Sequence, residues 1–190
     1  MKKYNFDSTH STIEFSARNM IVSSVRGRFT NFAGLIALDP DDLARSKVLV
    51  EIDGSSILTD NPRRDADLRS AEFFDVATYP LISFASERIE VEDHHLRVTG
   101  ALTMRGVTRE VTLDVEPLGS LTDPYNRGHI ALSASTVVDR SDLFKPGVMA
   151  ALMGERVTLT FDIRGVSATA GRPGTAQPTR GPASLPMLSA

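Results

Sequence analysis

Residues 61–80, NPRRDADLRSAEFFDVATYP, lie between segments in which apolar and polar residues alternate. The stretch holds seven charged residues and two adjacent phenylalanines, Phe73 and Phe74. Asn61 suits the N-cap of a helix, and Pro62 suits the first helical position, where a backbone N–H has no partner within the helix. The stretch therefore predicts a short helical segment near 61–71, inserted between strands.

On both sides of this stretch, apolar residues recur at every second position, the period of a strand with one buried face. In TIEFSAR (12–18), Ile13, Phe15 and Ala17 share one face. The second segment of this kind is long, and Gly27 and Gly34 are its candidate bend points. The pattern predicts eight strands, at 11–18, 25–38, 47–53, 81–91, 95–104, 107–117, 128–138 and 155–165.

Short connections between most of these segments favour antiparallel neighbours. Eight such strands close most economically into a barrel, which leaves no sheet edge exposed. A two-sheet sandwich has the same periodicity and stays open as an alternative. Small residues expected to face inward, namely Ala17, Ala85, Gly100 and Ala134, fit a cavity for one slender ligand and a solid core equally well.

Composition excludes several classes of protein. The chain has 190 residues, 41% of them hydrophobic, with a net charge of −3 and no cysteine. Disulfides and thiolate chemistry are therefore excluded, and no basic face predicts a nucleic-acid partner. No segment approaches the roughly 20 apolar residues that cross a bilayer, so transmembrane insertion is not expected.

The two ends of the chain carry different expectations. The first residues, MKKYNFDSTHS, have two lysines but no apolar run behind them, so no secretory signal is visible and a cytoplasmic location is expected. Residues 167–190 hold four of the ten prolines and no aromatic residue, which predicts a disordered tail behind a domain at 1–166.

Side chains for catalysis or metal binding are sparse. His94 and His95 are strand neighbours that point to opposite faces, so they are not expected to share a metal. His10 is expected to make a structural hydrogen bond near the barrel rim, and His129 has no acid or nucleophile near it in the sequence. No phosphate loop, nucleophile elbow or zinc spacing is present, so no catalytic residue, metal or cofactor is predicted.

Four motifs follow one another along the chain. They are D-x-x-H-S-x-I-x-F at 7–15, V-x-G-x-F at 25–29, the stretch at 61–80 with its continuation to Phe84, and G-x-L-T-x-R-G-V-T at 100–108. In this order and spacing they resemble the YceI-like family, a lipocalin-like group associated with polyisoprenoid binding, over residues 4–166. Asn19 and Asp67 depart from the pattern, because the family usually has histidine at these places.

The resemblance implies a closed eight-stranded antiparallel lipocalin-like barrel that accommodates a long isoprenoid chain, as in a polyprenyl lipid or isoprenoid quinone. A tail of ten carbons could contribute about 8 kcal/mol before ordering costs, at roughly 0.8 kcal/mol for each methylene. Binding, sequestration or carriage of such a hydrophobic ligand is the leading hypothesis. The alternatives are an isomerase, dehydratase or cyclase that uses His10, Arg64 or Asp65, and a stress-response protein whose partner binds the exterior; exposed strand faces are also compatible with a homodimer.

Two long connections are expected to cover the barrel. In the first, Arg64, Asp65 and Arg69 either form pairs that hold the loop or present an arginine to a ligand head group. The second is a capping loop or helix near 141–153, which holds too many apolar residues for a solvated loop. The predicted ligand-binding residues, at the lining or the mouth, are Phe15, Ala17, Phe29, Phe32, Arg64, Leu68, Phe73, Phe74, Phe84, Leu102, Phe144, Met149 and Met153.

Overall fold

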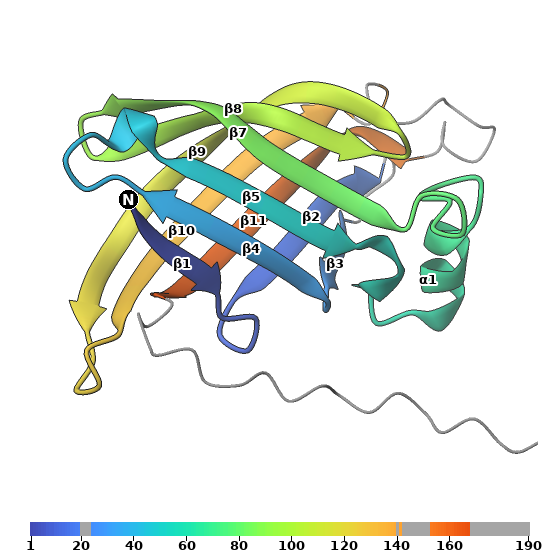
Figure 1. Cartoon of the computed structure of the whole chain (residues 1–190). Helices are drawn as coiled ribbons and strands as arrows, with labels where there is room; N and C mark the ends of the chain where they lie inside the picture. The colour runs from blue at the N-terminus through green and yellow to red at the C-terminus, as the bar shows by residue number, and fades with distance from the viewer. Residues whose placement is uncertain (20–23, 140, 142–152, 168–190) are drawn as a thin grey trace, which may run out of the picture.

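A closed antiparallel sheet makes up almost the whole structure (Figure 1). The structure is a computed structural model that describes residues 1–19, 24–139, 141 and 153–167. Its strand segments are β1 (Lys2–Phe6), β2 (Thr12–Asn19), β3 (Ser24–Phe29), β4 (Phe32–Leu38), β5 (Lys47–Asp53), β6 (Ile57–Leu58), β7 (Leu81–Glu92), β8 (His95–Met104), β9 (Val107–Thr122), β10 (Gly128–Asp139) and β11 (Met153–Ser167). The short helices are η1 (Leu43–Arg45), η2 (Gly54–Ser56) and α1 (Pro62–Arg69).

These eleven segments occupy eight strand positions. β1 and β2 lie end to end along β11, β4 and β3 continue one another beside them, and β5 and β6 follow in the third position. β7, β8, β9, β10 and β11 fill the remaining five. The ring closes where β1 and β2 both pair with β11, with Tyr4 opposite Ser167 and Ile13 opposite Phe161. The predicted eight-stranded barrel is thus confirmed, and the sandwich alternative is set aside.

The strand expected at 25–38 is interrupted, but not at its glycines. It breaks at Thr30 and Asn31, between β3 and β4. Gly27 and Gly34 lie within strands, and a Cβ added to either would overlap the ring of Phe15 or of Phe6, respectively. The prediction that these glycines bend the strand was wrong, since they leave room for aromatic rings on the inner face.

Segment β1 was missed by the sequence analysis. Residues 2–6 show only one strongly buried side chain, Tyr4, so their alternation is too short to be recognised without the partner strands. β6, with two residues, lies below the length at which a period can be read.

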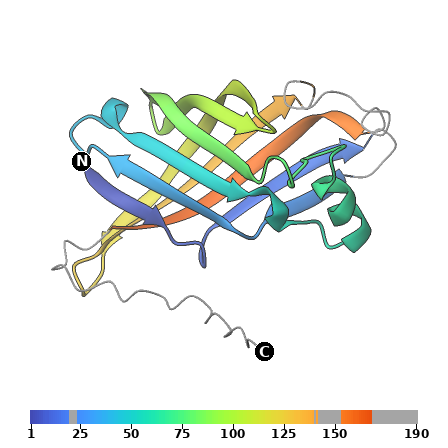
Figure 2. The same cartoon turned by 45° about the vertical axis from the view of Figure 1, so that its right-hand side comes forward.

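The helix at 61–71 forms as its capping residues predict. The Asn61 side chain accepts a hydrogen bond from the Arg64 backbone N–H, and Pro62 begins α1. α1 lies at one end of the barrel, opposite the end where the N-terminus and η1 lie (Figures 1 and 2). Within the residues described, no helix is long and apolar enough to span a membrane.

The inner face of the sheet holds one continuous apolar cluster that all of the longer strands build. Ala134 belongs to it, and Ala17 is also buried. Ala85 was placed on the wrong face, because it lies opposite Leu49, which is 51% exposed on the outside. The proposed cap near 141–153 and the tail after residue 167 fall almost entirely outside the described residues.

Candidate functional site: an apolar cavity inside the barrel

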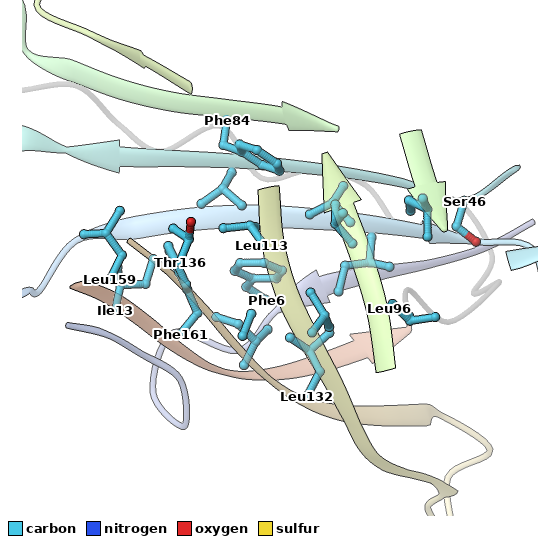
Figure 3. A pocket seen from close by; sticks show the side chains of 18 of the residues that line it. Phe6, Ile13, Ser46, Phe84, Leu96, Leu113, Leu132, Thr136, Leu159 and Phe161 are labelled. Carbon is cyan, nitrogen blue, oxygen red and sulfur yellow. The ribbon is translucent and has the colours of Figure 1, made fainter. Parts of the chain in front are cut away.

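A cavity of about 360 Å³ runs inside the barrel. Side chains from opposite walls point toward it, among them Phe6, Phe84 and Phe161 (Figure 3). A large share of the wall comes from inward-facing residues of the four neighbouring strands β8 to β11, namely Leu96, Val98, Leu102, Val111, Leu113, Val115, Ile130, Leu132, Ala134, Leu159, Phe161 and Ile163. The period-two pattern of these strands therefore places an apolar surface around a common interior.

No acidic or basic side chain lies among the described residues that line this cavity. Serine and threonine supply the hydroxyl groups of the lining, and two of these already have protein partners. The Thr136 hydroxyl donates to the carbonyl oxygen of Thr112 at 2.8 Å, and Ser46 Oγ accepts from the backbone N–H of Asp39 at 2.9 Å. Such a lining suits a hydrocarbon chain and offers no acid–base group for catalysis.

The cavity opens at the end that holds η1 and the β9–β10 hairpin. Pro117 and Ser120 line it there and are exposed, although both lie on its inner side. Val91 lies opposite the lining residue Leu96 on the inner face, and yet it is 55% exposed. Residues of the inner face become exposed only where the barrel is open, so this end is the mouth. Leu43 of η1 contributes the facing edge.

The end near α1 is filled by packed apolar side chains. The ring of Phe29 lies 5.8 Å from that of Phe15 and meets that of Phe74 edge-on, with 6.1 Å between centroids. Leu68 of α1 and Ile57 of β6 are almost completely buried beside them. Phe74 anchors the segment through its ring, and the segment covers this end.

Polar residues of α1 hold the loop that carries β6. The Asp65 carboxylate accepts from the backbone N–H and the hydroxyl of Thr59, at 2.8 and 2.6 Å. Arg64 donates to the Thr59 hydroxyl and carbonyl, while Arg69 donates to the carbonyls of Ser55 and Ile57. The two arginines thus bind the carbonyl oxygens of Ser55, Ile57 and Thr59, alternate residues of the segment that contains β6, which favours the structural interpretation of these residues. These residues do not pair with one another as expected, because Thr59 donates to the Asp65 carboxylate and the arginines donate to loop oxygens.

The predicted ligand-binding residues fall into three groups. Phe29, Phe84 and Leu102 line the cavity. The second group, Phe15, Ala17, Phe32, Arg64, Leu68, Phe73 and Phe74, lies outside the lining, mostly in the packing around the α1 end. Phe144, Met149 and the side chain of Met153 are outside the described part of the chain.

Many lining residues were not among those predicted. The alternation at 107–117 and 155–165 had already placed Leu113, Val115 and Leu159 on an inward face, so a signal for them existed. The predicted aromatic residues instead lie largely outside the lining, since among those described only Phe29 and Phe84 contribute to it. Leu43 and Ser46, in the loop before β5, had no periodic signal at all.

The histidines considered for chemistry lie away from the cavity. His10 Nδ1 and Asp7 Oδ2 are 2.7 Å apart at the surface, and this hydrogen bond lowers the pKa of Asp7. His129 does have an acid beside it, since its Nε2 lies 3.1 Å from Asp123 Oδ2. Desolvation opposes ionisation of Asp123, but hydrogen bonds from the Arg127 backbone and from the side chains of His129 and Arg127 hold its pKa far below the usual range.

The sequence model of the YceI-like domain matches residues 4–165, the range that forms this barrel. The chain belongs to the YceI-like family. A UPF0312 protein of Enterobacter sp. (strain 638) is 34% identical over 140 residues, which cover 74% of this chain and 73% of that protein.

Solved structures have the same fold as this YceI-like protein. The Campylobacter jejuni YceI protein superposes with a TM-score of 0.68 and 26% identity, covering 77% of this chain and 87% of its own. A polyisoprenoid binding domain from Saccharophagus degradans gives a TM-score of 0.65 over 88% of this chain and all of that domain. Its 19% identity supports a shared fold alone.

Proposed function

We propose that this protein binds a long-chain isoprenoid or a similar amphiphilic lipid, such as a polyprenyl lipid or isoprenoid quinone, in the barrel interior and carries or sequesters it. The observation that supports this most is the cavity itself, whose described lining is almost entirely apolar and carries no charged side chain, and which is open at one end. Family membership and the structural likeness to a polyisoprenoid binding domain support the same class of ligand.

The open and closed ends of the cavity favour one orientation of the bound ligand. The chain enters past Pro117 and Ser120, and its tail end lies toward Phe29 and the packed α1 end. A polar head group remains at the mouth, where backbone groups and the Ser120 hydroxyl are accessible. Arg64 does not serve as the head-group contact, since it lies on α1 at the closed end and its guanidinium donates to Thr59.

The enzymatic alternative finds no support in the described lining. His10, Arg64 and Asp65 were its acid–base candidates, and none of them lines the cavity. Carriage or sequestration needs only burial of methylene groups, each worth roughly 0.8 kcal/mol.

Native mass spectrometry of freshly purified protein tests the proposal. We expect an added mass that dissociates on collisional activation and that lipid extraction identifies as an isoprenoid amphiphile. Titration with retinol, a fluorescent isoprenoid alcohol, should also give saturable binding to the protein after delipidation. A protein that carries no lipid when purified and does not bind retinol would refute the proposed function.

A further inference from the structure

Large apolar side chains are exposed around the mouth of the cavity. Leu118, Leu121 and Tyr125 are 50%, 64% and 78% exposed on the part of the β9–β10 hairpin that projects beyond the barrel (Figures 1 and 2). Met1 and Val91 lie at the same end and are also exposed. Contiguous exposed apolar surface usually marks a binding surface for a protein or a membrane.

The projecting hairpin, residues 117–128, which we call the arm, carries exposed apolar side chains next to the part of it that lines the cavity. Pro117 lies opposite Leu132, and the register shift that follows makes Leu118 an extra residue of β9. Leu121 lies opposite His129, on the outer face. The inner side of the arm is the cavity lining itself, through Pro117, Gly119 and Ser120. The outer apolar surface is therefore continuous with the interior of the barrel.

The charges of the arm cancel one another. Its only charged side chains are Asp123 and Arg127, whose Oδ2 and Nε lie 2.7 Å apart. The Asp123 carboxylate also accepts from the backbone N–H groups of Tyr125 and Arg127, and the Arg127 guanidinium lies 5.6 Å from the Tyr125 ring centroid. Such a tip can enter a lipid head-group layer without desolvating an unpaired charge. Tyrosine is enriched at that depth because it joins an apolar ring to a polar hydroxyl.

The rest of the rim has charges of both signs. Lys2, Lys3 and Arg45 are exposed there, and so are Asp41 and Asp42. This mixture gives no preference for an anionic surface. A bilayer of zwitterionic lipids fits the neutral arm and the mixed rim better than an anionic one does.

We propose that the arm inserts shallowly into the interface of a zwitterionic bilayer, so that the mouth of the barrel opens directly onto the lipid. This inference rests on the proposed function, because the cargo is then a membrane lipid. Each methylene exposed to water lowers the population of the desorbed lipid roughly fourfold, which slows transfer through water. A mouth that is seated in the bilayer removes that step for the whole chain.

Flotation of the full-length protein with phosphatidylcholine vesicles tests the inference. The arm variant is Leu118→Ser/Leu121→Ser/Tyr125→Ser. The matched control, Leu49→Ser/Tyr79→Ser/Leu81→Ser, removes as many exposed apolar side chains away from the mouth. We expect the arm variant to partition onto vesicles at least roughly tenfold more weakly than wild type, and the control to stay within about twofold.

Retinol binding in the absence of vesicles separates this inference from the proposed function, since none of the six substituted residues lines the cavity. All three proteins should bind retinol equally well, and only the arm variant should extract it from vesicles more slowly. Wild-type protein that binds retinol but does not float with vesicles would overturn the inference and leave the function intact. Equal losses in both variants would also overturn it. So would a dimer that the arm variant converts to monomer with no change in flotation, because the arm would then be a self-association surface.

Discussion

Ala134→Phe places a ring in the middle of the proposed binding site. Ala134 is 5% exposed, lines the cavity, and lies between Val115 on β9 and Phe161 on β11. A phenyl group there occupies the space of about four methylene groups of a bound chain. At roughly 0.8 kcal/mol each, the ligand loses about 3 kcal/mol, which corresponds to a dissociation constant roughly 100-fold higher.

The assay is titration of delipidated protein with retinol, followed by fluorescence. Ala33→Phe is the matched control, because Ala33 is exposed on β4 and does not line the cavity. The control should bind retinol as wild type does. Thermal unfolding of both variants checks that they fold, since overpacking of a filled core costs about 1–3 kcal/mol. A folded Ala134→Phe protein with unchanged affinity would refute the placement of the ligand in this interior.

Three further substitutions test the surroundings of the cavity. Phe74→Ala should lower the free energy of unfolding by about 2 kcal/mol in urea titrations, because it removes a half-buried ring from Phe29; an unchanged midpoint would contradict the anchor assignment. Asp65→Ala should cost about 2–3 kcal/mol because the buried Thr59 N–H and hydroxyl lose their acceptor, whereas the exposed Asp67→Ala should change little; similar values for both would contradict it. The lowered pKa of Asp123 means that its contribution to stability is complete above the usual aspartate range, near 4, and is lost as the pH falls through the folded-state value. Asp123→Asn should therefore be less stable than wild type at pH 7, with a gap that narrows in acid, and a gap that is constant down to pH 3 would argue against this linkage.

The barrel could be predicted from the sequence because the apolar residues of each strand mark the face that points inward. In β10, every second residue from Ile130 to Val138 is apolar except Thr136, and in β11 every second residue from Val157 to Ile163 is apolar, so the inward face is visible before any pairing is known. The helix at α1 was visible for a different reason, since Asn61 and Pro62 are capping residues whose preferences are local. Both signals depend on neighbours in the chain and not on closure of the sheet.

Which end of the cavity is open could not be predicted in this way. Whether an end of a barrel is open depends on which loops lie across it, and Val91 or Pro117 has the same alternation in either case. Arg64 was a candidate for the mouth, because an arginine beside a head group and an arginine bound to loop carbonyls have the same sequence spacing. Only the contacts of Arg64 and Arg69 separate the two roles.

Gly34 controls the width of the cavity through the ring of Phe6. The Phe6 ring lies over its Cα on the inner face and also forms part of the tunnel wall, so any substituent at position 34 must drive that ring toward the tunnel axis. A homologue with alanine at position 34 would have a narrower cavity, while the pairing between β1 and β4 stayed the same. The cross-section of the cargo, from a slim saturated chain to a methyl-branched one, is therefore adjustable by one residue that never touches the cargo itself.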